Sequence, residues 1–96
     1  MVASVHRSVN ERRKAGALAL ARDSMRCECE CDRTECGSSF EITLASYDDV
    51  RADGCRFVVA PAHQGLGEAM VSVVQAYSVI EKVGEQGLAA QALDPR

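Results

Sequence analysis

Four cysteines lie within ten residues of this 96-residue chain, in the segment 27–36, which reads CECECDRTEC. A chain of this length buries only about 60–65% of the surface that it exposes when unfolded, so its hydrophobic core is thin. Domains of this size commonly depend on a metal or another cross-link for stability. The sequence therefore predicts one small domain, spanning 1–96, that a metal site holds together.

Cysteine usage also bears on the compartment. The chain has five Cys, contains no apolar run near the roughly 20 residues that a membrane helix needs, and begins without the apolar segment of a secretory signal. We therefore expect a cytoplasmic protein. Reducing conditions in the cytoplasm keep thiols free, so metal binding explains the cluster better than disulfides do.

The spacing of the thiols in 27–36, here called the knuckle, suits a tetrahedral metal. In an extended segment alternate side chains share a face, so Cys27, Cys29 and Cys31 point the same way. Cys36 can complete the site from a tight loop. Acidic residues interleave the thiols and would raise their pKa, whereas a divalent cation would deprotonate them. Structural zinc is the favoured occupant, and an iron–sulfur cluster, a redox dithiol or free thiols remain as alternatives.

The two histidines and the fifth cysteine have different expected roles. His63 follows an apolar run at 56–60 and is a candidate for a distant fourth ligand. His6 lies in a basic segment without thiols, and we expect it on the surface. Cys55 stands apart from the knuckle and is expected to be a half-buried free thiol.

Hydrophobic patterning predicts a small α+β domain with an antiparallel sheet. A basic N-terminal helix is expected over 4–22, followed by a zinc-binding α+β core over 25–93. The apolar stripe of the helix contains Val5, Val9, Gly16 and Leu20, with Ala17 beside it. The elements expected in the core are an extended stretch at 25–31, strands at 40–44, 56–60, 71–74 and 77–83, a short helix at 45–53 and a terminal helix at 84–93. One helix across 70–83 is the alternative to the last two strands.

Charge divides the chain into two parts. Residues 1–26 carry six Lys or Arg and two acids, a balance of +4, whereas residues 27–96 carry five and twelve, a balance of −7. Because complementary fields select partners, we expect the basic helix to bind an acidic protein partner. The candidate partner-binding residues are Arg7, Arg12, Arg13 and Lys14. Nucleic acid is the alternative partner, but the acidic knuckle and the lack of interleaved aromatic residues weigh against it.

No catalytic signature accompanies the metal motif. The sequence has no G-x-S-x-G, H-E-x-x-H, phosphate-binding loop or dinucleotide fingerprint. Four protein ligands would also close a tetrahedral metal and leave no position for a reacting water. The sequence therefore favours a zinc-binding protein-interaction or regulatory module without catalytic activity. A nucleic-acid-binding zinc protein is the alternative.

Several blocks of the sequence resemble a family of small, uncharacterised actinobacterial proteins. The matching blocks are NER at 10–12, CEC-x₄-C at 29–36, FEITLASYDDVRAD at 40–53, RFVVAPAH at 56–63, VIEKVGE at 79–85 and DPR at 94–96. The resemblance implies that Cys29, Cys31, Cys36 and His63 are the ligands of a Cys₃His zinc site. Cys27 is an extra thiol relative to the family and would give a Cys₄ site if it replaced His63. Ala62 stands where the family usually has Gly, which limits that turn to conformations that a Cβ tolerates.

Overall fold

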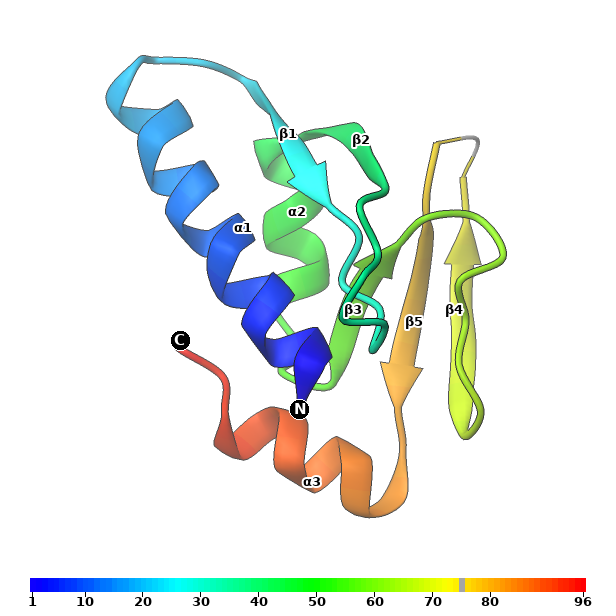
Figure 1. Cartoon of the computed structure of the whole chain (residues 1–96). Coiled ribbons are helices and arrows are strands. Elements are labelled where there is room, and N and C mark those ends of the chain that lie inside the picture. The colour runs from blue at the N-terminus through cyan, green and yellow to red at the C-terminus, as the bar shows by residue number, and fades with distance from the viewer. Residues whose placement is uncertain (75) are drawn as a thin grey trace.

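The computed structural model describes residues 1–74 and 76–96, and it has the predicted α+β fold. Figure 1 shows α1 on one side of the molecule, two small antiparallel sheets beside it and α3 across one end. The elements are α1 (Val2–Ala19), β1 (Ser24–Glu28), β2 (Ser39–Thr43), α2 (Leu44–Arg51), β3 (Arg56–Val59), β4 (Glu68–Val73), β5 (Ser78–Lys82) and α3 (Gly84–Ala92). No helix in these two ranges combines the length and apolar character that crossing a bilayer requires.

The first sheet pairs β1 with β2, and its side chains alternate between core and solvent. Met25 lies opposite Ile42, and Cys27 lies opposite Phe40, in an antiparallel register. All four of these side chains are buried, while their neighbours along each strand are more exposed. This alternation is the period-2 pattern that the sequence predicted for a half-buried strand.

The second sheet has the order β3-β5-β4, so the expectation of one antiparallel sheet was too simple. The strands predicted at 71–74 and 77–83 form as β4 and β5, and the alternative of a single helix was wrong. The two sheets meet at the knuckle, where the Glu30 N–H donates to the carbonyl of Val58 at 2.8 Å. Stacking of Phe40 on Tyr77, with ring centroids 5.3 Å apart, is a second link between them.

Helix α1 begins and ends earlier than the predicted range of 4–22. At its start, the Ala3 N–H donates to the Asp32 carboxylate, which is distant in sequence. At its end, Ala21 has a left-handed backbone with a φ of 54°, and the Arg22 N–H bonds the carbonyl of Ala17 at 2.9 Å. These bonds form a Schellman stop, which usually contains Gly at the position that Ala21 occupies.

The buried side of α1 is also not the predicted stripe. Val5 and Leu20 are 63% and 67% exposed, whereas the side chains that face the core follow a different set of helical positions. That buried set is Ala3, Ser4, His6, Arg7, Asn10 and Ala17. The helix is therefore turned so that polar side chains, rather than its Val and Leu residues, meet the rest of the molecule.

Two of these buried polar residues were predicted to lie on the surface, and both predictions were wrong. Arg7 was expected on a partner-binding surface, but it is fully buried and donates to the carbonyls of Gly54 and Ala90. Its guanidinium also lies 4.4 Å from the centre of the Phe57 ring, a cation–π contact. His6 was expected on the surface, but it is buried, and its Nδ1 donates to the Cys31 carbonyl at 2.9 Å.

The short helix and the terminal helix agree with prediction to within two residues at each end. Helix α2 starts where it does because the Thr43 hydroxyl accepts from the Ser46 N–H at 3.1 Å, a standard N-cap. The helix is then fixed by Arg51, whose fully buried guanidinium pairs with Glu11 of α1 and Asp94 near the C-terminus.

Candidate metal centre

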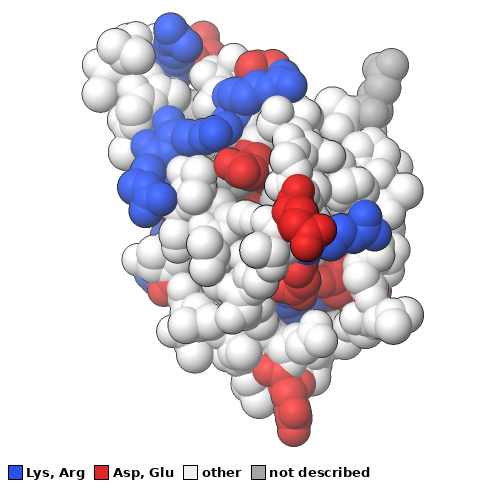
Figure 2. Space-filling model, in the orientation of Figure 1, with Lys and Arg blue, Asp and Glu red and all other residues white. Residues whose placement is uncertain are grey.

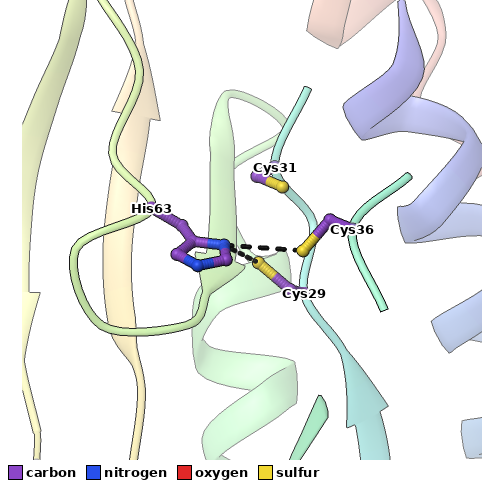
Figure 3. A group of neighbouring side chains, drawn as sticks. All are labelled: Cys29, Cys31, Cys36 and His63. Carbon is purple, nitrogen blue, oxygen red and sulfur yellow. Dashed lines mark hydrogen bonds between the residues drawn. The ribbon is translucent and has the colours of Figure 1, made fainter. Parts of the chain in front are cut away.

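Four side chains from three segments converge on one point between the two sheets. Cys29 and Cys31 come from the segment after β1, Cys36 from the loop before β2, and His63 from the loop after β3. Figure 3 shows the three sulfurs and the imidazole pointing toward one another. One ligand atom of each residue lies within 4.8 Å of all the others, so the group can hold a metal ion.

The distances suit a tetrahedral metal with sulfur and nitrogen ligands. His63 Nδ1 lies 3.4 Å from the Cys29 sulfur and 3.5 Å from the Cys36 sulfur. Zinc binds sulfur at about 2.3 Å and nitrogen at about 2.0–2.1 Å. At tetrahedral angles these bond lengths place a ligand nitrogen about 3.6 Å from a ligand sulfur. The nitrogen that faces the sulfurs is Nδ1, so it is the ligand atom that the structure offers.

Backbone hydrogen bonds hold the ligand-bearing loops in place. The Cys29 N–H donates to the Ser38 carbonyl at 3.0 Å, and the Cys36 N–H closes a turn onto the Arg33 carbonyl. The Ala60 N–H donates to the Cys29 sulfur at 3.1 Å, which ties the end of β3 to the first ligand. Outer bonds of this kind orient the ligands of a metal site before the metal binds.

The turn that presents His63 contains an unfavourable backbone conformation. Ala62 has a φ of 67°, in the left-handed region where a Cβ is strained. The turn was expected to adopt a conformation that a Cβ tolerates, but Ala62 takes one that a Cβ disfavours. The His63 N–H closes this turn by donating to the Ala60 carbonyl at 3.1 Å.

Glu30, which the sequence analysis treated only as one of the interleaved acids, is the centre of a buried hydrogen-bond network. It is completely buried and accepts from the Asn10 amide at 2.9 Å, the Tyr47 hydroxyl at 2.8 Å and the Val58 N–H at 2.9 Å. Asn10 also donates to the Glu28 carbonyl and accepts from its N–H. Because Glu30 stands between Cys29 and Cys31 in sequence, this network sets the path of the chain between two ligands.

Two other acids of the knuckle also form internal contacts. Asp32 accepts from the N-terminus of α1 and pairs with the fully buried ammonium of Lys82. Lys82 pairs in turn with Glu68 at 2.6 Å, and the carboxylate of Glu68 is only 4% exposed. Glu28 makes an ion pair with Arg13 at 3.3 Å. The knuckle is therefore less of an exposed acidic surface than its sequence suggests.

The thiols differ in their electrostatic surroundings. Burial raises the pKa of Cys29 to about 12. Burial also acts to raise the pKa of Cys36, but hydrogen bonds from Ser38 and the neighbouring thiols outweigh it and hold that pKa below its usual range. A divalent cation among the thiols would stabilise all three thiolates together. Cys36 and His63 line a surface hollow of about 240 Å³, which gives ions access to the site.

Cys27 and Cys55 lie outside the group of four. Cys27 was considered as an alternative ligand, but it lies in β1, is fully buried and is not among the converging side chains. Cys27 lies opposite Phe40 in the β1–β2 sheet, whereas Cys29 and Cys31 follow the end of β1. Burial, together with the Glu30 charge, raises the pKa of Cys27 well above its usual range. Cys55 is a half-buried free thiol, as predicted.

The candidate partner-binding residues do not form one surface. Arg12 and Arg13 are exposed on α1, as expected. Lys14 is half-buried and pairs with Asp48 of α2, and Arg7 lies in the core. Two of the four predicted residues therefore hold the fold together rather than facing solvent.

In comparisons with protein-family models, with curated proteins and with solved structures, nothing matches this chain. The geometry of the site and the chemistry of its residues therefore carry the functional argument.

Proposed function

We propose that this chain is a zinc-binding protein-interaction or regulatory module whose Cys₃His site has a structural role. The observation that carries the proposal is the convergence of the Cys29, Cys31 and Cys36 sulfurs with His63 Nδ1 at separations that suit zinc. Three thiolates and an imidazole are a standard donor set for structural zinc, and hard cations such as Mg²⁺ prefer oxygen ligands.

The position of the site supports a structural role. Three ligands come from the connection between β1 and β2, and the fourth comes from the connection between β3 and β4, so a bound ion would cross-link the two sheets. Structural zinc contributes apparent binding free energies of about 10–16 kcal/mol in small domains, against total stabilities of about 5–15 kcal/mol. We therefore expect the fold to depend on the metal.

We propose a non-catalytic role because four side chains would fill the tetrahedral coordination of zinc and leave no open position for water. The ligand thiols are all free cysteines, and three reduced thiols at one site are compatible with a reducing compartment. The cytoplasm is therefore our proposed location. Membership of the small actinobacterial family also stays a proposal, supported by the meeting of its CEC-x₄-C and FVVAPAH blocks in one site.

An acidic protein is the proposed partner, and the exposed arginines of the N-terminal region support it. Nucleic acid is the alternative. Base stacking needs accessible aromatic rings, yet Tyr47 and Phe57 are fully buried and Phe40 stacks on Tyr77. The aromatic residues therefore support the protein partner over the nucleic acid.

The proposed function is tested by metal analysis of freshly purified, reduced protein and two matched variants. We expect one zinc per chain in the wild type and in Cys27→Ser, because Cys27 lies outside the group of four. Cys36→Ser removes a ligand and should lose zinc on dialysis, together with much of its helical circular dichroism. Iron, absence of metal in the wild type, or equal loss of zinc in both variants would contradict the proposal.

A further inference from the structure

A groove lies between the C-terminal half of α1 and the start of β1, and none of its lining residues is a candidate metal ligand. It encloses about 210 Å³ and has an apolar floor formed by Ala17 and Met25, both of which are buried. Leu20, which is 67% exposed, stands on its rim. The volume is smaller than the roughly 300–1,000 Å³ of pockets that enclose a whole small molecule, so it suits a side chain of a larger partner.

Three arginines surround this floor, and the groove lining contains no acidic residue among those that the structure describes. They are Arg13, Arg22 and Arg26. Figure 2 shows Lys and Arg side chains gathered over the part of the molecule that Figure 1 assigns to α1 and β1. An apolar floor inside a basic rim matches a segment that is both apolar and acidic.

The arginines differ in how far their charge is already compensated. Arg13 pairs with Glu28 and donates to the Arg26 carbonyl at 3.2 Å, so its charge is already partly compensated. Arg26 donates to the Ser39 hydroxyl at 3.0 Å and lies opposite Glu41 in the sheet. Arg22 is exposed at the Schellman stop of α1, and its side chain makes no ion pair with any described residue. The charge at Arg22 is therefore the one most available to a partner.

We propose that this groove binds a short acidic segment of a partner protein, with one apolar side chain on the Ala17 and Met25 floor and flanking carboxylates on the arginine rim. This inference rests on the proposed interaction function and deepens it by naming the site and the chemistry of the partner. Of the partner-binding residues expected from sequence, the inference keeps Arg13, and it adds Arg22 and Arg26.

The test measures fluorescence anisotropy of a short labelled peptide in which Leu alternates with Asp or Glu, titrated with zinc-loaded protein. Arg22→Glu and Leu20→Ser are the groove variants, and both positions are exposed. Arg12→Glu is the matched control, because it makes the same charge change on α1 outside the groove lining. Two further probes replace the acids of the peptide with Lys or its Leu with Ser, and a poly-dT oligonucleotide represents nucleic acid.

We expect the acidic Leu peptide to bind the wild-type protein. Each groove variant should bind this peptide about fivefold more weakly or worse, because it loses a charge pair or an apolar contact. Arg12→Glu should weaken peptide binding less than twofold, roughly the effect that a distant, screened charge has on affinity. The Lys and Ser probes should bind more weakly than the acidic Leu peptide. Failure of the acidic Leu peptide to bind, equal losses in Arg12→Glu and Arg22→Glu, or tighter binding of poly-dT would overturn the inference.

Metal content and circular dichroism of the same samples keep the two proposals separate. A zinc-loaded, folded protein that does not bind the peptide contradicts the groove and leaves the structural zinc site intact. A metal-free protein that binds the peptide at the groove contradicts the zinc proposal instead.

Discussion

The hydroxyl of Tyr47 should contribute measurably to stability, because it donates to the buried carboxylate of Glu30. The bond is 2.8 Å long and both residues are fully buried. Burial, reinforced by the Glu30 charge, raises the pKa of Tyr47 far above its usual range, so its hydroxyl stays protonated and remains a donor. Tyr47→Phe removes this donor and leaves the ring in place.

The expected loss of stability depends on the hydrogen bonds that Glu30 retains in the variant. A hydrogen bond to a charged group contributes about 1.5–3 kcal/mol, and the carboxylate retains its bonds from Asn10 and the Val58 N–H. We therefore expect Tyr47→Phe to lower the free energy of unfolding by about 2 kcal/mol. For a domain of this size that loss lowers Tm by about 8 °C or more.

Tyr77→Phe is the matched control. Tyr77 is half-buried, its ring stacks on Phe40, and its hydroxyl has no hydrogen bond to the residues that the structure describes. The assay is urea unfolding of both variants and wild type at saturating zinc and pH 7, with equal m-values as a condition for comparison. Losses for Tyr47→Phe and Tyr77→Phe that agree within about 0.5 kcal/mol would refute the role of Glu30 as a hydrogen-bond centre.

Three further outcomes are expected from the same unfolding assay, the first two at pH 7 and the third across a range of pH. Ala62→Gly should stabilise the protein by about 0.5–1 kcal/mol, because relief of the left-handed strain exceeds the entropy that Gly adds to the unfolded chain. Ala52→Gly, at a right-handed position, is the control and should destabilise the protein. Lys82→Met should cost about 3–5 kcal/mol, because it leaves a buried partner carboxylate unpaired. Burial acts to raise the pKa of Asp94, but hydrogen bonds, including one from Arg51, hold it below 3.8. The stability that Asp94 contributes is therefore present above about pH 4 and lost below it, so wild type and Asp94→Asn should converge in acid.

Much of the fold could be predicted because local signals agreed with tertiary packing. The alternation of Phe40 and Ile42 with polar residues identified β2, and Thr43 provides the cap that starts α2. The end of α1 could not be predicted in this way, because its Schellman stop has Ala21 where Gly is usual. Its start depends on Asp32, which is far away in sequence.

The orientation of α1 was missed because hydrophobicity was taken as the guide to burial. The positions of Ala3, Arg7, Asn10 and Ala17 follow helical spacing of three and four residues, but two of them are polar. Their partners are backbone carbonyls and a carboxylate from other elements, which a single sequence does not reveal. The weak apolar stripe was the available signal that this helix packs through polar groups.

The four candidate ligands were predicted by combining thiol spacing with the family resemblance, and the structure brings them together. Spacing alone left Cys27 and His63 as alternative fourth ligands, because the prediction from spacing requires an extended segment that runs through Cys31. The role of Glu30 was missed because an acid between two cysteines is usually solvated. Its burial depends on donors from α1, α2 and β3 that meet only in the folded chain.

Zinc-edge X-ray absorption on the protein as purified tests the central claim most directly. We expect one zinc per chain with three sulfur ligands at about 2.3 Å and one nitrogen at about 2.0–2.1 Å, from Cys29, Cys31, Cys36 and His63. Four sulfur ligands would show that Cys27 displaces His63. The absence of a zinc edge, or a spectrum dominated by oxygen ligands, would contradict the proposed structural zinc.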